Sequence, residues 1–364
     1  MKFECKSDVF IKLVQQVGKA RSKVQRDSSL QDIHIELNDH LLTLRATNLE
    51  LFCEKSIPVK GLTNGACLIH GETLLRILST FTAKDITLTC EVIDGVFCIT
   101  TEKGVIEIKT NPYEDFPTLP KQGDQIGGIA KATLISLFKE VSFCSAKTDI
   151  KPEISSIFIY TKEDSIYSVA TDSFRLAEKT FPNESSLDFS FLLPEKHIGE
   201  IIQIINEEGD DTINLFKNNS IISLSSSNLT LSIHTITGHF PDYHQLFPKE
   251  FTTTAVVSKE ELQKGLLLTT FFNEQYSQVE CVFSGEKCTL HSKNEKVGQV
   301  THTFPITKEG EDIEVKYNNK FFLEVLPYIE GDTVICSFTT PNRPLFIKGV
   351  KDISFTYLLM PLNR

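Results

Sequence analysis

The chain has 364 residues, of which 40% are hydrophobic and 23% charged, which is the composition of an ordinary globular protein. No apolar run approaches the ~18 residues of a membrane-spanning helix, and the N-terminal Met1-Lys2-Phe3-Glu4-Cys5 lacks the apolar core of a signal peptide. The formal net charge of −11 argues against a protein that coats its whole surface with nucleic acid.

The first third of the chain predicts two helices and several strands. A short strand at residues 2–5 leads into a helix with Ser7 as the expected N-cap, and the buried face of this helix carries Phe10, Leu13, Val14 and Val17. Residues 33–36 and 42–46 alternate between apolar and polar side chains, as half-buried strands do. A second helix face carries Leu74, Ile77, Leu78 and Phe81. Hairpins are expected at Asp94-Gly95 and Lys103-Gly104, and the Gly-rich residues 121–128 are predicted to be a linker.

A common spacing links the three parts of the chain. The segment Ala170-Thr171-Asp172-Ser173-Phe174-Arg175 echoes Ala46-Thr47-Asn48-Leu49-Glu50-Leu51, 124 residues earlier. At the same spacing the first helix face returns as Leu134, Leu137, Phe138 and Val141. The second helix face returns as Ile198, Ile201, Ile202 and Ile205, and again as Phe322, Val325, Leu326 and Ile329. A third, shifted copy of the first helix carries Leu262, Leu266 and Thr269 after a Ser258-x-x-Glu261 capping box.

A repeat of this length indicates one structural unit present three times. We place the three domains at residues 1–122, 126–250 and 251–364. Each domain combines strands joined by short hairpins with two amphipathic helices, so the fold class is α+β with antiparallel sheets. The two helices are expected to cover one face of the sheet, and the sheet edges stay available to pair with the next domain.

Basic residues gather at the end of the first helix and in the loop after it. Between Asp8 and Asp27 there is no acidic residue, and the segment carries Lys12, Lys19, Arg21, Lys23 and Arg26. The matching region of the second domain carries Lys139, Lys147 and Lys151. For any single lysine a solvated helix face is the commoner explanation.

The common catalytic motifs, such as GxxxxGK[ST], GxGxxG, HExxH and GxSxG, are missing from the sequence. His234, His239 and His244 loosely suggest metal ligands, but a fourth ligand is missing, so we expect no metal and no cofactor. Nine cysteines without a Cys-x-x-Cys pair fit reduced thiols in the cytoplasm. Asp172 and Ser173 could act in a hydrolase, yet Asp-Ser at a turn is more often an Asx turn, and no histidine is placed to activate the serine.

Two apolar segments remain ambiguous. Arg175, between Phe174 and Leu176, is either an ordinary surface arginine or a residue at the rim of an apolar groove. Five consecutive apolar residues, 358–362, close to the chain end form either a docked strand or one wall of a binding site.

The whole chain resembles the bacterial sliding clamp family, the beta subunits of the replicative DNA polymerase. The resemblance rests on short motifs in family-like order: Met1-Lys2-Phe3, Gln15-Gln16-Val17, Ala46 to Glu50, Glu114-Asp115-Phe116-Pro117, Ala170 to Ala177, Phe240-Pro241-Asp242-Tyr243 and Met360-Pro361. It implies three clamp-type domains per chain, with antiparallel sheets outside and two helices per domain inside, which close into a ring as a head-to-tail homodimer. The implied protein is a non-catalytic processivity factor of a DNA-directed DNA polymerase.

The resemblance also implies partners and sites. The partners are duplex DNA without sequence preference, a second copy of the chain, the polymerase, the clamp loader and other proteins that dock by short peptides. No membrane is expected among them. The DNA-facing candidates are Lys12, Lys19, Arg21, Lys23, Arg26, Lys139, Lys147, Lys151, Lys196 and Lys264. At the dimer interface Ile106 and Ile108 are expected to face Phe271 and Phe272, although ordinary core positions are the commoner alternative for all four.

The peptide groove implied by the family consists of Ile154, Thr171, Ser173, Phe174, Arg175, Leu176, Pro241, Gln245, Leu246, Leu358, Leu359, Met360, Pro361 and Leu362. In it, Arg175 is expected to donate to peptide carbonyls at the rim, and the apolar walls are expected from Leu176, Leu246, Leu359, Met360 and Leu362.

The chain departs from the family pattern at three places. Ser173-Phe174 replaces the usual Gly-His, Leu362-Asn363-Arg364 replaces the usual end, and Glu72-Thr73 stands where the second helix often begins with basic residues. The alternatives to a clamp are a repeat protein that binds only other proteins, and a hydrolase that uses Asp172 and Ser173.

Overall fold

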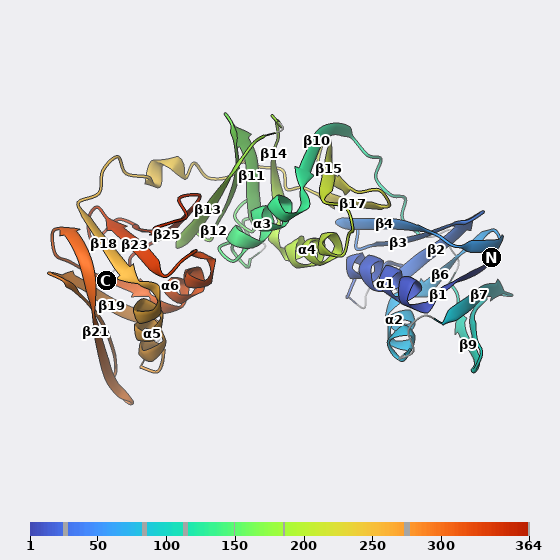
Figure 1. Ribbon diagram of the computed structural model, residues 1–364, viewed down its shortest axis with the longest axis horizontal. Helices are drawn as coiled ribbons and strands as arrows, with labels where there is room; N and C mark the ends of the chain where they lie inside the picture. The colour runs from blue at the N-terminus through green and yellow to red at the C-terminus, as the bar shows by residue number, and fades with distance from the viewer. Residues whose placement is uncertain are drawn as a thin grey trace. The chain divides into compact units, whose positions relative to one another are not determined.

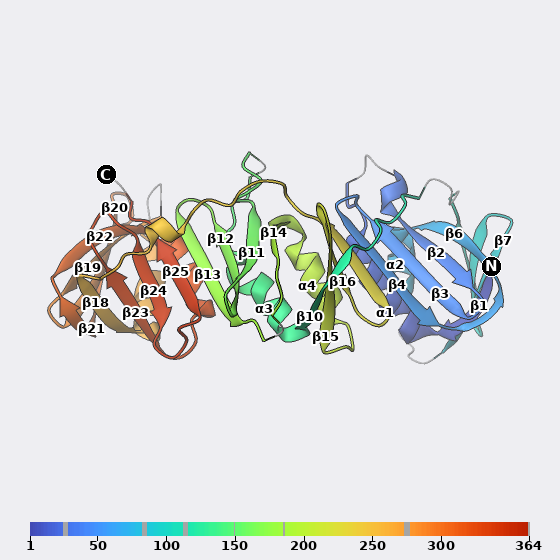
Figure 2. The same ribbon diagram turned by 90° about the horizontal axis from the view of Figure 1, so that it is seen from above.

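The computed structural model describes residues 1–24, 28–81, 86–111, 116–148, 150–184, 186–272 and 277–362, with only the backbone described at Ser28 and Ser29. Within these residues, none of the helices has both the length and the apolar character needed to cross a membrane. The chain forms two compact units, one of residues 1–135 and 196–235, the other of residues 136–195 and 236–364 (Figures 1 and 2).

Within its described residues, the first unit contains two antiparallel sheets and three complete helices. The smaller sheet has the order β5-β1-β7-β8-β9, with β1 at Lys2–Lys6, β5 at Lys60–Thr63, β7 at Thr87–Ile93, β8 at Val96–Thr101 and β9 at Gly104–Lys109. The larger sheet has the order β10-β15-β16-β17-β4-β3-β2-β6, with β2 at Asp32–Asn38, β3 at Leu41–Thr47, β4 at Leu51–Pro58, β6 at Gly65–His70, β10 at Asp124–Ala130, β15 at Thr212–Asn218, β16 at Ile221–Ser225 and β17 at Leu229–His234.

The helices of this unit are α1 (Ser7–Val17), α2 (Gly71–Ser79) and α4 (Ile198–Asn206), with 3-10 turns η1 (Gly18–Ala20) and η2 (Ser28–Gln31). Helices α1 and α2 lie side by side against one face of the larger sheet (Figure 1). The predicted arrangement of two helices on one sheet face is therefore confirmed for the first domain.

The second unit contains one twelve-stranded sheet, ordered β14-β11-β12-β13-β25-β24-β23-β18-β21-β20-β19-β22. Its strands are β11 (Ser156–Lys162), β12 (Ser165–Thr171), β13 (Arg175–Pro182), β14 (Ser190–Pro194), β18 (Thr253–Ser258), β19 (Gln278–Ser284), β20 (Lys287–Asn294), β21 (Gly298–Gly310), β22 (Ile313–Asn318), β23 (Thr333–Phe338), β24 (Leu345–Gly349) and β25 (Phe355–Leu359). The helical segments are α5 (Lys259–Thr270), α6 (Asn319–Val325), η5 (His244–Leu246) and η6 (Leu326–Tyr328), while α3 (Lys131–Ser142) and η4 (Glu195–His197) span the boundaries between the units.

The predicted helix faces lie in the core. All four apolar residues of the first helix face and all four of its first copy are at most 2% exposed. In α5, Leu262, Leu266 and Thr269 are fully buried, and Ser258 caps the helix by accepting from the N–H of Glu261. The second face is buried only in part: Ile77, Phe81 and Ile202 are half-buried, and in α4 Ile204 takes the buried position that was expected for Ile202.

Two local predictions were wrong. Ser7 is the first helical residue and not the N-cap, because β1 continues to Lys6 and leads directly into α1. The Gly-rich segment expected to be a linker contributes the strand β10, which pairs with β15 and shifts register between Gln125 and Gly127. Glycine suits this place because a Cβ on Gly128 would come within 2.9 Å of Thr212.

Strand pairing joins successive domains within each unit. In the first unit β17 of the second domain pairs with β4 of the first, and in the second unit β25 of the third domain pairs with β13 of the second. Both pairings are antiparallel, and β4 and β13 occupy equivalent places in the 124-residue repeat. Because the sheets continue across the domain junctions, the three sequence repeats form two compact units, and the central repeat is divided between them.

A buried lysine lies at each junction, again at equivalent positions. Lys55 contacts the carboxylate of Glu208 and donates to Gln16 Oε1 at 2.8 Å, and the Lys55 and Glu208 side chains are 11% and 2% exposed. In the second unit Lys179 bridges Glu140 at 2.9 Å and Asp352 at 3.0 Å. Each of these buried lysines binds two partners, and it thereby links a helix, a strand and a loop across the junction.

We expect Lys55→Met to destabilise the first unit by about 3–5 kcal/mol, because it leaves the Glu208 carboxylate buried without its cation. The measurement is the urea midpoint of unfolding for this unit. Lys60→Met is the matched control, since the Lys60 side chain is 65% exposed in its pair with Glu4 and should contribute less than about 1 kcal/mol. Equal effects of the two substitutions would contradict a structural role for the buried network.

Candidate functional site

The turn between β12 and β13 is held by its own side chains. Asp172 Oδ1 accepts hydrogen bonds from the N–H groups of Phe174 and Arg175, each at 3.0 Å. Thr171 Oγ1 donates to the Arg175 carbonyl at 2.6 Å. Ser173, at φ 77°, is in the left-handed region. The predicted Asx turn is confirmed, and it presents Phe174 with 62% of its surface exposed.

The sequence echo in the first domain forms the same turn. Asn48 Oδ1 accepts from the N–H groups of Glu50 and Leu51 at 3.0 and 2.7 Å, and Leu49 has φ 73°. An asparagine and an aspartate thus produce one backbone shape, because each supplies the same acceptor oxygen.

Ser173→Gly is expected to stabilise the second unit by about 1 kcal/mol, because glycine adopts a positive φ without the Cβ clash that serine carries. The shift in the thermal midpoint of unfolding measures the effect. Ser173→Ala keeps the Cβ and removes the hydroxyl, so it should give no gain. A gain from alanine as large as that from glycine would assign the effect to the hydroxyl instead.

Arg175 is buried, with 8% of its surface exposed, and its donors are used inside the protein. Its Nε donates to Asp172 Oδ2 at 2.9 Å, its Nη1 contacts the carboxylate of Glu324 on α6, and its Nη2 donates to the Phe143 carbonyl at 2.8 Å. The guanidinium also lies 4.2 Å from the centre of the Phe321 ring. This fork holds the turn against α6, and donation by Arg175 to peptide carbonyls stays a prediction.

The same contacts bear on the hydrolase alternative. Asp172 Oδ1 accepts two backbone hydrogen bonds and Oδ2 accepts from Arg175, so the carboxylate that a hydrolase needs as a base is fully engaged. Among the described residues there is also no group of three or more His, Cys, Asp or Glu side chains that could hold a metal ion.

Behind the turn lies an apolar core and not a groove wall. Leu176 pairs with Leu358 across β13 and β25, and both pack with Tyr160, Val169, Tyr243 and Phe346. Leu176 and Leu359 are 2% and 0% exposed, so their assignment as groove walls was wrong. These residues were assigned by family position, which does not show whether a side chain faces a groove or the core.

A chain of hydroxyl groups crosses this core. Tyr243 donates to Glu178 Oε2 at 2.5 Å and lies 2.8 Å from the Tyr160 hydroxyl. Burial, together with the charge of Glu178, raises the pKa of Tyr243. Burial also raises the pKa of Tyr160, to about 12. Both hydroxyls therefore stay protonated. Their hydrogen bonds hold the segment 240–247 against the sheet.

The exposed groove candidates come from three segments of the second unit. Ser173 and Phe174 lie at the turn, Leu246 is 37% exposed in η5, and residues 360–362 follow β25 with partial exposure. Met360 N–H donates to the Phe174 carbonyl at 2.9 Å, and Leu362 N–H donates to the Lys316 carbonyl at 2.8 Å. The tail is thus anchored at both ends, one of them on the β12–β13 turn.

The remaining groove candidates are less informative. Pro241 and Gln245 are exposed, and Gln245 Nε2 donates to Asp242 Oδ2 at 2.7 Å. Thr171 and Ile154 are each 8% exposed, and Ile154 lies between α3 and β11, where its carbonyl accepts from the N–H of Ala146.

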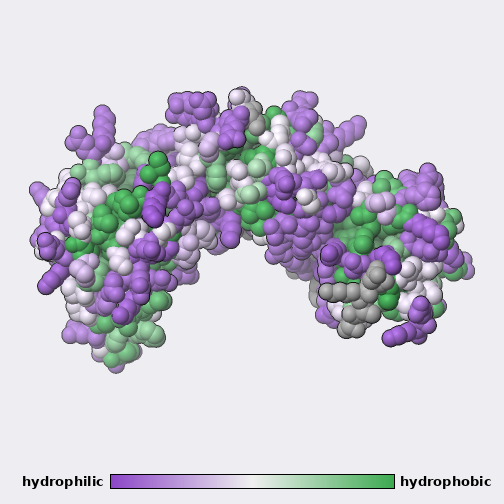
Figure 3. Space-filling view, viewed as in Figure 1, coloured by the Kyte–Doolittle hydropathy of each residue, from purple (hydrophilic) through white to green (hydrophobic). Residues whose placement is uncertain are grey.

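The dimer candidates divide between core and surface. Ile108 is 6% exposed and Ile106 is half-buried, both on β9, which ends the smaller sheet of the first unit. Phe271 is 72% exposed directly after α5, and Phe272 is half-buried. Figure 3 shows apolar surface around this end of α5 and the β20–β21 turn, where Leu267 and Val297 are also exposed.

The basic candidates lie on or near helices of both units. Four of them form ion pairs: Lys19 with Glu207, Lys23 with Glu200 at 2.7 Å, Lys147 with Glu195, and Lys196 with Glu50 at 2.6 Å. Lys12, Lys139, Lys151 and Lys264 are exposed, and Arg26 lies outside the described residues.

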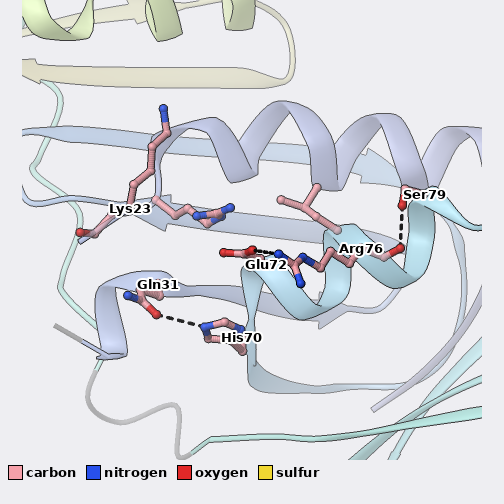
Figure 4. Close-up of a pocket in the computed structure, with 9 residues that line it drawn as sticks. Lys23, Gln31, His70, Glu72, Arg76 and Ser79 are labelled. Atoms are coloured by element: carbon pink, nitrogen blue, oxygen red, sulfur yellow. Dashed lines mark hydrogen bonds and ion pairs between the residues drawn. The ribbon is translucent and has the colours of Figure 1, made fainter. Parts of the chain in front are cut away.

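A pocket of about 640 Å³ opens in the first unit beside the start of α2 (Figure 4). It is lined by Arg21, Ser22, Lys23, Gln31, His70, Glu72, Leu75, Arg76 and Ser79. His70 lies 3.0 Å from Gln31 Oε1, and Glu72 pairs with Arg76 at 2.8 Å. Sequence reasoning missed Arg76 in α2 and His70 at the end of β6, because a lone arginine and a lone histidine carry no pattern.

Family models cover the chain almost end to end. Residues 1–120 match the DNA polymerase III beta subunit N-terminal domain, residues 128–242 its central domain and residues 244–363 its C-terminal domain. A beta sliding clamp of Rickettsia bellii is 24% identical over 96% of this chain and 97% of its own length. The beta sliding clamp of Haemophilus influenzae is 23% identical over the full length of both chains.

Solved structures give the same fold. The DNA polymerase III subunit beta of Pseudomonas aeruginosa has a TM-score of 0.94 at 19% identity, with both chains fully covered. The Thermotoga maritima beta subunit has a TM-score of 0.94 at 22% identity, over 100% of this chain and 99% of that one. A P. aeruginosa clamp bound to griselimycin has a TM-score of 0.94 at 20% identity and full coverage of both chains.

Proposed function

This chain belongs to the family of DNA polymerase III beta subunits, the beta sliding clamps, and on that premise we propose that it is a ring-forming processivity factor for DNA replication. It encircles duplex DNA and tethers the replicative polymerase and other proteins to it. The role is non-catalytic and belongs in the cytoplasm. The observation that carries the proposal is the succession of N-terminal, central and C-terminal clamp models along one chain. We assign the three domains to residues 1–122, 126–250 and 251–364.

The ring is proposed to be a head-to-tail homodimer. Support comes from the strand pairing at the two junctions within the chain, β17 with β4 and β25 with β13. A third junction of this kind needs a β9 edge from one chain and a β21 edge from another. Head-to-tail contacts between identical chains form a closed ring when the rotations from each copy to the next add up to one full turn.

DNA inside the ring is proposed to meet basic side chains on the helices. The candidates are Lys12, Lys19, Arg21, Lys23, Arg26, Lys139, Lys147, Lys151, Lys196 and Lys264. Long, mobile cations attract the phosphate backbone without reading bases, so the ring can slide.

Partner proteins are proposed to bind in the second unit, where Phe174, Leu246 and the tail residues 360–362 offer apolar surface around an anchored turn. A short peptide with apolar anchors suits such a surface. The P. aeruginosa clamp bound to griselimycin supports ligand binding by this fold. Because tethering raises the local concentration of a partner to about millimolar for a short linker, moderate affinity is sufficient.

The test is retention on DNA of different topology. Direct binding to short linear duplex should be weak and should fall as salt rises. After loading on closed circular DNA the ring should resist the same salt, and linearising the circle should release it. Equal loss from closed circles and linear fragments would contradict encirclement.

A further inference from the structure

A continuous band of aromatic rings lies on one face of the sheet in the second unit. Ser168 donates to the Leu137 carbonyl of α3, so its neighbour Tyr167 on β12 lies on the face opposite α3. From Tyr167 each ring contacts the next, with centroids between 4.7 and 6.2 Å apart. In this order the aromatic band consists of Tyr167, Tyr160, Phe158, Phe240, Tyr243 and Phe247. It joins β11 and β12 to the segment that packs across them.

The stacking leaves ring surface open to solvent. Tyr160 lies nearly parallel to both of its neighbours, at 8° to Tyr167 and 22° to Phe158. Phe240 lies at 18° to Phe158. Tyr160 itself is 9% exposed, whereas the other three rings of this stack are half-buried. Flat aromatic area of this kind suits a binding surface, because rigid rings supply contact area at a low cost in conformational entropy.

The 124-residue repeat separates what the fold needs from what it does not. Phe240 stacks on Phe158 at 5.2 Å, and in the first unit Phe116 stacks on His34 at 5.3 Å. Each pair lies 124 residues from the other. One ring contact therefore holds the segment after the sheet in both units, and this contact has a structural role.

Beyond that contact the two units differ. Thr43 and Glu36 of the first unit stand 124 residues before Tyr167 and Tyr160, and Arg45 binds Glu36 at 2.5 Å. The strands that carry these polar residues pair all the same, β2 with β3 as β11 pairs with β12. Because polar side chains are compatible with the same strands, the two tyrosines serve something other than strand pairing.

Carboxylates surround the aromatic band. Glu163 and Asp164 are exposed in the turn between β11 and β12. Asp242 is exposed just before Tyr243, whose hydroxyl donates to Glu178. The negative charge around the rings favours a cationic partner and repels the phosphates of nucleic acid.

A guanidinium group suits both features of this surface. The segments 158–167 and 240–250 together contain four acidic residues and two lysines, so the excess charge is negative. Guanidinium is planar, stacks on aromatic rings and pairs with carboxylates. Arg175 shows the combination within this protein, since it lies 4.2 Å from the centre of the Phe321 ring and binds Glu324.

We propose that the aromatic band binds an arginine-bearing peptide segment of a partner protein. Leu246, an exposed residue of the proposed peptide site, lies in the chain between Tyr243 and Phe247 of the band. A partner docked at Leu246 can therefore continue over the band, where its arginines stack on Tyr167 and Phe158. The inference rests on the proposed docking of partner peptides in the second unit and adds a second contact of different chemistry. Two linked contacts bind more tightly than either alone, because the second forms at high effective concentration.

The experiment titrates the full-length protein by fluorescence anisotropy with two labelled peptides, one of alternating arginine and proline and one with lysine in place of arginine. Tyr167→Thr introduces the side chain that the first unit has at position 43, and it should weaken binding of the arginine peptide about fivefold, as loss of one cation–π contact does. Tyr167→Phe keeps the ring and should bind as the wild type does. The lysine peptide should bind more weakly than the arginine peptide, because ammonium is not planar and is more strongly hydrated.

A second variant tests the charges without touching the core. Glu163→Gln combined with Asp164→Asn changes only the exposed turn, so it should weaken binding of the arginine peptide and make it less dependent on salt. The matched control is Glu309→Gln combined with Glu311→Gln, two exposed carboxylates at the end of β21, which should have no effect. This pair of double variants decides the matter if Tyr167→Thr does not fold.

The outcomes distinguish this surface from the proposed peptide site. Arginine-peptide binding that survives deletion of residues 360–364 but weakens in Tyr167→Thr supports the band, even if docking at the tail fails. If the wild type does not bind the arginine peptide, or Tyr167→Thr binds it equally well, the inference is wrong. Equal affinity for the lysine peptide would contradict stacking. A labelled single-stranded oligonucleotide that binds the wild type and loses affinity in Tyr167→Thr would assign the rings to bases instead. Retention on closed circular DNA reports separately on the clamp function.

Discussion

Phe271→Glu is expected to convert the dimer into monomers of 41.0 kDa and to abolish retention on closed circular DNA. Phe271 is 72% exposed in the single chain, so the substitution leaves the core of the second unit intact. An aromatic residue at the centre of an interface typically contributes about 2–4 kcal/mol, which is about 30- to 1000-fold in the dissociation constant. Sedimentation at micromolar concentration measures the change.

The expectation rests on strand edges that follow the repeat. In the first domain β9 occupies the place that β17 and β25 occupy in the later domains, and it lies at the end of its sheet. Residues 298–305 of β21 occupy the place of β4 and β13 and, in the described part of the chain, pair with a strand on one side only, β20. Pairing β9 with this part of β21 in a second copy would satisfy both edges.

The control is Leu49→Glu. Leu49 is 49% exposed in the Asx turn between β3 and β4 of the first domain, and neither strand belongs to the proposed interface. It should leave the dimer unchanged. A Phe271→Glu protein that sediments as the wild type does would remove Phe271 from the interface. If the wild type itself sediments as a monomer at micromolar concentration, the head-to-tail ring is wrong.

Periodicity predicted the elements well because it reports burial. The spacing of 124 residues located both helices of each domain and the Asx turn, and most of the apolar residues at those positions are buried, with Ile77, Phe81 and Ile202 half-buried. It missed β10, because a glycine-rich strand has no side-chain pattern to detect. It also chose Ile202 over Ile204, since on a helix with isoleucine at most positions the pattern does not single out one face.

The candidate site was less predictable, because sequence order does not indicate which side chains meet. Arg175 reads as a surface residue until Glu324 and the Phe143 carbonyl are found beside it, 149 and 32 positions away. Leu359 reads as part of an exposed tail, yet it pairs with Arg175 in the middle of a sheet. The pocket around Arg21 combines residues that follow η1 with residues of η2, β6 and α2, and no regular spacing connects them in the sequence.

Deleting residues 360–364 is expected to abolish binding of partner peptides and stimulation of the polymerase, while dimerisation and loading on DNA survive. The deletion starts after β25, so the pairing of β25 with β13 and β24 is retained. It removes the partly exposed Met360, Pro361 and Leu362, together with the hydrogen bonds from Met360 to Phe174 and from Leu362 to Lys316. Loss of these apolar anchors should weaken peptide binding at least about tenfold.

Two further variants make the tail deletion decisive. Removing only Asn363 and Arg364 leaves both anchoring hydrogen bonds, so peptide affinity should stay close to that of the wild type. Phe174→His introduces the residue usual in the family and keeps the backbone carbonyl that accepts from Met360, so it should change which peptides bind while leaving the tail in place. Fluorescence anisotropy with labelled peptides measures the peptide affinity of both variants. Because Arg175 is buried and binds Asp172, Glu324 and Phe143, the discrimination between peptides should depend on the exposed Phe174 and the tail. Unchanged peptide binding after deletion of residues 360–364 would place the partner site elsewhere on the protein.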